Sequence, residues 1–229
     1  MLTQHSGAPE SETKDRILRT AFQLFHEQGF HATGIATIVR EAEVNPGSLY
    51  HFFESKDQLL LSVLEFAIGY LGPAVMEPVE RQVADPIQRV FALLSQYRDG
   101  MARHGCRMGC PIGNLALEVS DGNAKARRLI HRNFENWAAR VEAWLVAAGD
   151  RLPPDLDRSQ LARFILTVME GGLMQARAAN DLKPFDDSVA VLRDHLTLLQ
   201  ARAAKSDHAA SKPKRARNKT HANTSTGRA

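Results

Sequence analysis

The sequence predicts an all-α fold in which a small N-terminal helical domain precedes a larger one. Apolar residues recur at helical spacing in nearly every segment between glycine and proline breakers. No stretch alternates convincingly at the period of two that an exposed strand requires. With 229 residues, of which 44% are hydrophobic, the chain can also bury a substantial core.

Three short helices and the start of a fourth are expected in the N-terminal part. The first runs from Thr13, a plausible N-cap, to Gln28, where Gly29 stops it. A second is expected over residues 33–42, and a third begins at Asn45-Pro46. A long fourth helix follows a capping box formed by Ser55 and Gln58. We therefore expect a flexible segment 1–12, a first domain 13–58 and a second domain 59–204.

After the fourth helix, the larger domain is expected to contain four more long helices. One starts after Asp85-Pro86 and runs to about residue 104. A glycine-interrupted connector, 105–122, contains a short helix near 112–119. Apolar residues from Ile130 to Ala148 then repeat at steps of three and four, which marks a continuous buried face over 123–148. Asp157 caps a helix that ends near Ala179, and a last one runs from Asp186 or Asp187 to about Ala204.

The stretch VNPGSLYHFFESK, residues 44–56, predicts a short helix with two different faces. Leu49, Phe52 and Phe53 share the apolar face, which must anchor the helix because two turns are not stable alone. The other face carries small or hydrogen-bonding groups. Two short helices joined by a tight turn form a helix-turn-helix, whose second helix enters the DNA major groove. The predicted DNA-binding residues are Thr33, Gly34, Ala36, Asn45, Pro46, Gly47, Ser48, Tyr50, His51 and Lys56.

Thr33 and Asn45 are expected to begin helices whose free amides bind phosphate, and Lys56 is expected to add a cation beside them. The alternative interpretation is that these two short helices only pack against each other in an ordinary helical bundle and do not bind DNA. Such a bundle would not require Gly47, Ser48 and His51 to point outward together.

The segment from Thr13 to Leu60 resembles the N-terminal domain of the TetR family of bacterial transcriptional regulators. The matching residues are Ile17, Leu18, Ala21, Leu24, Phe25, Gly29, Phe30, Thr33, Ile38, Ala42, Val44, Gly47, Leu49, Tyr50, Phe53, Lys56 and Leu60. The resemblance implies a homodimer whose second domain binds a small-molecule inducer and whose partner is double-stranded operator DNA.

The chain departs from the family pattern at three positions. Pro46 stands where Lys or Arg is frequent, and Ala36 where a polar side chain often reads a base. Glu43 occupies a turn position where Gly is common, at a cost of about 1 kcal/mol if the backbone there is left-handed.

The connector contains the run GCPIGNLALE, residues 109–118, which resembles a run in a subset of the family. In some members a cysteine here senses oxidants or electrophiles, and Cys110 corresponds to it by position. Because Cys110 precedes a short helix, the helix N-terminus could favour its thiolate. A buried packing role is the alternative, and two thiols without a nearby His pair make an incomplete metal site. No cofactor or metal is predicted.

An inducer pocket is expected inside the bundle of the helices 86–104, 123–148 and 157–179. Aromatic and Met side chains there offer adaptable apolar walls suited to a lipophilic or aromatic compound, although such residues also build ordinary cores. The predicted ligand-binding residues are Tyr97, Met101, Cys110, Phe134, Trp137, Phe164, Met169 and Met174. The predicted dimer interface, on the last two helices, consists of Gly171, Gly172, Val189, Leu192, Leu196 and Leu199.

Charge and composition narrow the function further. The segment 205–229 carries seven basic residues and one acidic residue, so the rest of the chain has a net charge of −3. This tail lacks large apolar residues and is expected to be disordered, either adding salt-dependent DNA affinity or acting as a neutral extension. Only two cysteines, no apolar signal segment and the interrupted apolar run 59–76 favour a cytoplasmic protein without a membrane span.

The sequence thus predicts a dimeric regulator, most simply a repressor, that binds a pseudo-palindromic operator and leaves it when a ligand binds. Oxidation of Cys110 is the alternative trigger. A helical interaction protein that has lost DNA binding is a second alternative. No catalytic motif of a hydrolase, a P-loop enzyme, a zinc protease or a dinucleotide-dependent enzyme is present in the sequence.

Overall fold

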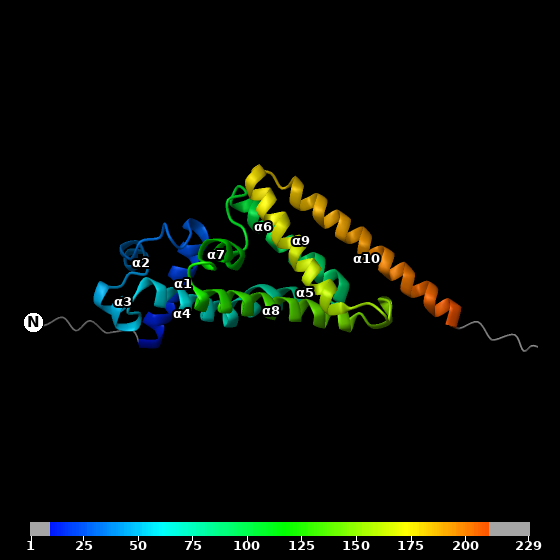
Figure 1. Cartoon of the computed structure of the whole chain (residues 1–229), viewed down its shortest axis with the longest axis horizontal. Coiled ribbons are helices and arrows are strands. Elements are labelled where there is room, and N and C mark those ends of the chain that lie inside the picture. The colour runs from blue at the N-terminus through cyan, green and yellow to red at the C-terminus, as the bar shows by residue number, and fades with distance from the viewer. Residues whose placement is uncertain (1–9, 211–229) are drawn as a thin grey trace, which may run out of the picture.

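The computed structural model describes residues 10–210, and within this range the chain is helical with no strand, as predicted. The helices are α1 (Glu10–Gln28), α2 (Ile35–Glu41), α3 (Pro46–Phe52), α4 (Lys56–Leu71), α5 (Glu77–Gln82), α6 (Pro86–Arg103), α7 (Pro111–Val119), α8 (Ala124–Ala147), α9 (Arg158–Ala179) and α10 (Lys183–Ala210). A π-helical turn, η1 (Gly72–Met76), joins α4 to α5, and a 3₁₀ turn, η2 (Gly149–Arg151), follows α8. In Figure 1, α2 and α3 lie at one end of the molecule and the end of α10 at the other.

Most of the predicted helix starts are confirmed by side-chain caps. Asp85 accepts hydrogen bonds from the amides of Ile87 and Gln88, and Asp157 accepts one from Gln160. Ser55 accepts one from the amide of Gln58, which completes that side of the expected capping box. These caps satisfy amides that have no partner inside the helix.

The predicted bounds of α1 and α10 were wrong. Helix α1 begins at Glu10 and not at Thr13, with Glu10 and Glu12 in its first turn, where negative charge is favourable. Helix α10 begins at Lys183 and continues to Ala210, so residues 205–210 of the expected disordered tail are helical. Residues 10–12 of the expected flexible segment 1–12 therefore belong to α1. Residues 1–9 and the rest of the tail lie outside the described residues.

The fourth helix continues through η1 into α5. The stretch Lys56–Gln82 is long and apolar enough to cross a membrane, which the sequence did not lead us to expect, and 39% of its most apolar window is buried. Its α4 part packs against α1 and α8. In addition, the buried Asn133 of α8 donates a hydrogen bond to the Leu64 carbonyl of α4. Packing against α1 and α8 in the protein core therefore accounts for the apolar composition of α4.

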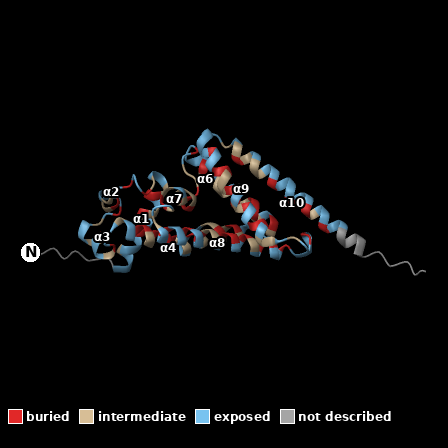
Figure 2. Cartoon of the chain, in the orientation of Figure 1, coloured by how far each residue is buried: buried red, intermediate tan, exposed pale blue. Residues whose placement is uncertain are grey.

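One core runs through both domains, and buried residues follow the facing sides of the helices in Figure 2. In the N-terminal domain, Ile38 of α2 and Leu49 of α3 are fully buried, together with Phe53 just after α3. Phe52, which was expected on the same face, is only partly buried. The apolar anchor predicted for α3 is therefore present.

Helix α10 packs along α9 of the same chain, and this packing uses most of the residues that were predicted to form the dimer interface. Leu192, Leu196 and Leu199 are buried without a second copy, and Val189 packs against the same core. A Cβ added to Gly172 would lie 2.9 Å from the ring of Phe185, so this glycine makes room for α10. The predicted stripe therefore joins two helices of one chain. A stripe at helical spacing does not reveal which chain covers it.

Candidate DNA interface and ligand cavities

Helix α3 presents the outward face that the sequence predicted. Pro46, Gly47 and His51 are exposed, Ser48 is half-buried, and 52% of the Tyr50 surface is exposed. The Asn45 side chain accepts a hydrogen bond of 2.7 Å from the Ser48 amide, so its oxygen serves as the N-cap. Small residues at the start of α3 leave its backbone accessible to a flat surface such as a base-pair edge.

The role predicted for Thr33 was wrong. Its side chain is fully buried, and its hydroxyl donates a hydrogen bond of 2.7 Å to the Gly29 carbonyl. Its amide is bonded to the same carbonyl. Thr33 therefore fastens the turn after α1, and α2 begins two residues later with Gly34 as its N-cap. Gly34 and Ala36 are exposed at this end of α2.

Lys56 is held against the turn between α1 and α2. Its ammonium lies 4.4 Å from the centre of the Phe30 ring and 3.4 Å from the carbonyl oxygen of His31. Burial lowers the pKa of Lys56. The ammonium is thus engaged with the protein, where the sequence led us to expect a free cation.

The turn between α2 and α3 has the backbone that the sequence analysis considered costly. Glu43 has a φ of 52°, in the left-handed region that glycine adopts more easily. The carboxylates of Glu43 and Glu41 are both exposed in this turn region. At the start of α1, Glu10 lies 3.7 Å from the His51 ring, so an acidic group borders the outward face of α3.

Helix α7 connects the second domain to the DNA-binding domain at two places. One Glu118 oxygen accepts a hydrogen bond of 2.7 Å from the Phe30 amide, and the other accepts one of 2.6 Å from the His31 amide. At the other end, His26 of α1 donates to the carbonyl of Gly109, just before α7, over 2.7 Å. Burial lowers the pKa of His26, which keeps its ring neutral. The position of α7 is thereby coupled to the last turn of α1 and to the residues that follow it.

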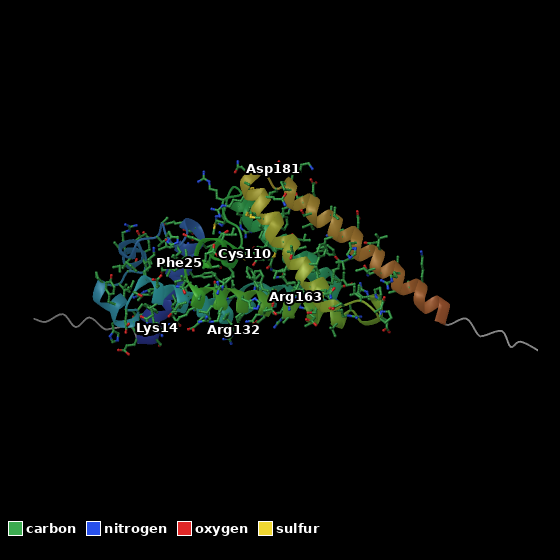
Figure 3. The ribbon with its side chains drawn as sticks, viewed as in Figure 1. Lys14, Phe25, Cys110, Arg132, Arg163 and Asp181 are labelled. Carbon is green, nitrogen blue, oxygen red and sulfur yellow. The ribbon has the colours of Figure 1, made fainter. Side chains whose placement is uncertain are left out.

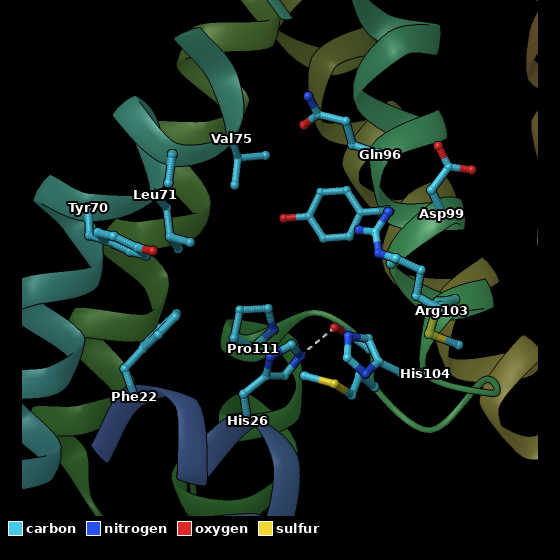
Figure 4. Close-up of a pocket in the computed structure, with 16 residues that line it drawn as sticks. Phe22, His26, Tyr70, Leu71, Val75, Gln96, Asp99, Arg103, His104 and Pro111 are labelled. Carbon is cyan, nitrogen blue, oxygen red and sulfur yellow. Dashed lines mark hydrogen bonds between the residues drawn. The ribbon is translucent and has the colours of Figure 1, made fainter. Parts of the chain in front are cut away.

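A cavity of about 540 Å³ lies between α1, α4, η1, α6 and the loop before α7, and we call it the α1 cavity. Phe22 and His26 of α1 form one wall, Tyr70 and Leu71 of α4 another, and Gln96 of α6 lies opposite (Figure 4). The dashed bond in Figure 4 is that of His26 with Gly109, so this contact forms part of the wall. Both apolar and hydrogen-bonding groups therefore face the same space.

A second cavity, of about 690 Å³, lies between α7, α8 and α9, and we call it the α9 cavity. Its wall contains Cys110 and Arg163, which Figure 3 labels, together with Phe134 and Met174. It also contains Glu170, whose carboxyl oxygen lies only 2.2 Å from the position that a Cβ on Gly113 would take. Gly113 is thus the residue that lets α7 pack against this carboxyl.

Of the two roles considered for Cys110, its position agrees with buried packing and not with an activated thiolate. The thiol is buried, and its pKa is raised well above the ordinary value by burial and by the neighbouring Glu170. The amides at the start of α7 act in the opposite direction but are outweighed. A neutral thiol is a weak nucleophile. The geometry therefore does not support the oxidant-sensing alternative.

The eight predicted ligand-binding residues do not line a single pocket. Tyr97 and Met101 line the α1 cavity, whereas Cys110, Phe134 and Met174 line the α9 cavity. Trp137 borders a small third cavity of about 160 Å³ and makes an edge contact with Tyr97. Met169 is buried in the core, and Phe164 packs against His195 with 47% of its surface exposed. Spacing along a helix could not assign these side chains to one side of α8 or α9.

The sequence analysis missed Glu118, Gly113 and Glu170. The first two lie in the GCPIGNLALE run, of which only Cys110 was assigned a role. Their partners are far away in sequence: Glu118 is 88 residues from Phe30. The run itself was therefore the available signal, but nothing local in it identifies those partners.

Comparisons with known proteins agree with this architecture. Residues 17–63 match the family model for bacterial regulatory proteins of the tetR family, and residues 86–192 match that for the tetracyclin repressor-like C-terminal domain. YxaF of Bacillus subtilis, an HTH-type transcriptional regulator, is 29% identical over 177 residues, which cover 76% of this chain and 89% of YxaF. The HTH-type transcriptional repressor NemR of Escherichia coli is 24% identical over 196 residues, covering 81% of this chain and 94% of NemR.

A solved structure shows the same fold. The regulatory protein TetR from Rhodobacter sphaeroides aligns with a TM-score of 0.71 at 25% sequence identity, covering 80% of this chain and 98% of that protein. The two family models together span both domains described above. The chain belongs to the TetR family of helix-turn-helix transcriptional regulators, which is a family of non-enzymatic proteins.

Proposed function

We propose that this protein is a dimeric repressor that binds a pseudo-palindromic operator through α3 and is released by a lipophilic or aromatic ligand. The outward face of α3, with Gly47, Ser48, Tyr50 and His51, supports the DNA contact. Gly34, Ala36, Asn45 and Pro46 are exposed beside it and complete the proposed surface. The name of NemR, a repressor, favours repression over activation.

The observation that carries the regulatory part is the wall of the α1 cavity. A ligand there would touch Phe22 and His26, which belong to the first helix of the DNA-binding domain. The same ligand would lie against the bond between His26 and Gly109, which ties that domain to α7. Filling this space would therefore change the spacing of the two α3 helices in a dimer. Coupling of this kind is worth typically about 1–3 kcal/mol, a release of tens-fold.

The dimer needs a surface other than the predicted stripe. Among the described residues, three exposed large hydrophobic side chains lie on α9 and α10 outside the α9 cavity, namely Phe164, Val191 and Leu198. Gly171, which was predicted at the interface, instead lines the α9 cavity. We place the interface on this face, where two copies can form a four-helix contact about a two-fold axis.

A footprinting experiment on the DNA upstream of the protein's own gene tests this function. We expect protection of two half-sites related by a two-fold axis and centred about one helical turn apart, or a multiple of it. A lipophilic aromatic compound that binds the protein should abolish the protection. Protection of a single unsymmetrical site, or none at any protein concentration, would contradict the proposal.

A further inference from the structure

We propose that Glu170 makes the α9 cavity a binding site for an apolar amine, with the carboxylate receiving the ammonium group. The proposal concerns a cavity that is separate from the α1 cavity. Binding of the amine does not depend on the proposed function, but an effect of the amine on DNA release does.

Glu170 has no compensating charge in the described part of the chain. One of its carboxyl oxygens is buried and lacks any hydrogen-bond partner among the described residues. Two arginines line the same cavity, but Arg163 is paired with Glu135, and no ion pair joins Arg177 to Glu170 in the described residues. The polar neighbour of the carboxyl is the thiol of Cys110, which is neutral. A buried carboxylate is costly unless it is paired, so this group favours a ligand that brings a cation.

The rest of the cavity selects an apolar body for that ligand. Its wall includes Ala116, Leu117, Phe134, Leu166, Leu173 and Met174. Phe134 offers an aromatic face that attracts a cation, and Met174 adapts its shape to different apolar groups. The terminal carboxyl torsion of a Glu is soft, so either oxygen of Glu170 can turn toward a ligand. An ammonium on an alkyl or arylalkyl chain matches both parts of the lining, since it forms a charge-assisted bond at one end and buries carbons at the other.

The location of the carboxyl connects this site to α7. The Glu170 oxygen lies only 2.2 Å from where a Gly113 Cβ would be, so a change in its position bears directly on the first turn of α7. At the other end of the same helix, Glu118 binds the amides of Phe30 and His31 in the DNA-binding domain. An amine on Glu170 therefore acts on the helix that binds the DNA-binding domain just after α1.

Calorimetric binding to the full-length protein near pH 8 tests the proposal with three probes that share one apolar part: 4-phenylbutylamine, 4-phenylbutanol and 4-phenylbutyrate. An amine is protonated there and a carboxyl with a pKa of about 7 is mostly ionised. We expect the amine to bind at least about tenfold more tightly than the alcohol or the acid, as one charge-assisted bond allows. Equal affinities for amine and alcohol, or no binding of the amine, would overturn the proposal.

Two matched variants locate the binding. Glu170→Gln keeps the size of the side chain, so we expect it to lose the preference for the amine while its affinity for the alcohol stays the same. Retained binding of the alcohol also shows that the variant is folded. Asp99→Asn removes a negative charge from the α1 cavity and is expected to keep the preference. A preference that survives Glu170→Gln, or disappears in Asp99→Asn, would assign the amine to another place.

These measurements are made without DNA, so they are independent of the footprinting experiment. Tight binding of the amine without loss of operator binding would leave the Glu170 site standing and would remove this cavity from the regulation. Intact operator binding together with equal affinity for the three probes would refute the site and leave the proposed repressor.

Discussion

At the residue scale, the backbone at Glu43 is the simplest feature to test. A non-glycine residue with a φ of 52° is strained by its Cβ. We expect Glu43→Gly to raise the free energy of unfolding by about 1 kcal/mol. Urea unfolding followed by circular dichroism measures the change.

The control is the same substitution two residues earlier. Glu41 is the last residue of α2, and glycine in a helix is unfavourable, so Glu41→Gly should lower the free energy of unfolding by up to about 1 kcal/mol. If Glu43→Gly destabilised the protein as much as Glu41→Gly does, the left-handed backbone at Glu43 would not be the source of strain.

Glu170 gives a pH-dependent prediction. Burial raises its pKa to about 7 in the folded protein, above the ordinary value of 4.5. The folded state therefore holds a proton that the unfolded state has released between these two values, and stability falls as the pH rises through this range. At pH 8 the ionised group costs at most about 3 kcal/mol, from 1.36 kcal/mol for each pKa unit.

Glu170→Gln should remove this cost. We expect the variant to be more stable than the wild type at about pH 8, by up to about 3 kcal/mol, and close to it at about pH 5. Urea unfolding of both proteins across this range isolates the effect, because the other titrating groups are common to both. A stability difference that does not change with pH would show that Glu170 is not an unpaired buried acid.

At the element scale, α7 carries the connection between the two domains. Replacing Glu118 by Ala leaves the amides of Phe30 and His31 without their acceptor. We expect a loss of about 2 kcal/mol in the free energy of unfolding, since hydrogen bonds to a charged group are worth about 1.5–3 kcal/mol. Hydrogen exchange of these two amides should become faster. Asp121→Ala, an exposed acidic residue just beyond α7, is the matched control and should leave both amides protected.

The elements also show what the sequence could predict. Helix existence was foreseeable because caps such as Asp85, Asp157 and Ser55 and stops such as Gly149 act through neighbouring residues. The apolar face and the outward face of α3 were also predictable, because they depend only on the spacing of residues within this helix. Pairings across long separations were not foreseeable. Whether Leu192 faces α9 or a second copy, and whether Phe134 and Tyr97 share a cavity, depends on how whole helices are placed.

The role of Thr33 was also not predictable from the sequence, although this residue lies within the segment that resembles the family. Its residue type fits a helix start as well as it fits a turn, and only the position of the Gly29 carbonyl decides that its hydroxyl is buried. Lys56 is a similar case, because the Phe30 ring that holds its ammonium lies far from it in sequence.

At the scale of the whole molecule, the exposed face of α9 and α10 predicts the dimer. Val191 and Leu198 are 68% and 69% exposed in the single chain. Placing a charge there should disrupt an apolar interface, so we expect Leu198→Asp to sediment as a monomer and to bind its operator at least about tenfold more weakly. Val146→Asp puts the same charge on an exposed apolar site of α8 and should stay dimeric. A dimeric Leu198→Asp would move the interface elsewhere.

The central claim is that the outward face of α3 contacts the operator. Fluorescence anisotropy with the duplex from the protein's own upstream region measures this contact most directly, using wild type, Tyr50→Ala and His51→Ala, with His131→Ala as an exposed histidine on α8. We predict that each α3 variant keeps its stability and loses about 1–3 kcal/mol of binding free energy, whereas His131→Ala binds like the wild type. Wild-type affinity in both α3 variants would contradict the account.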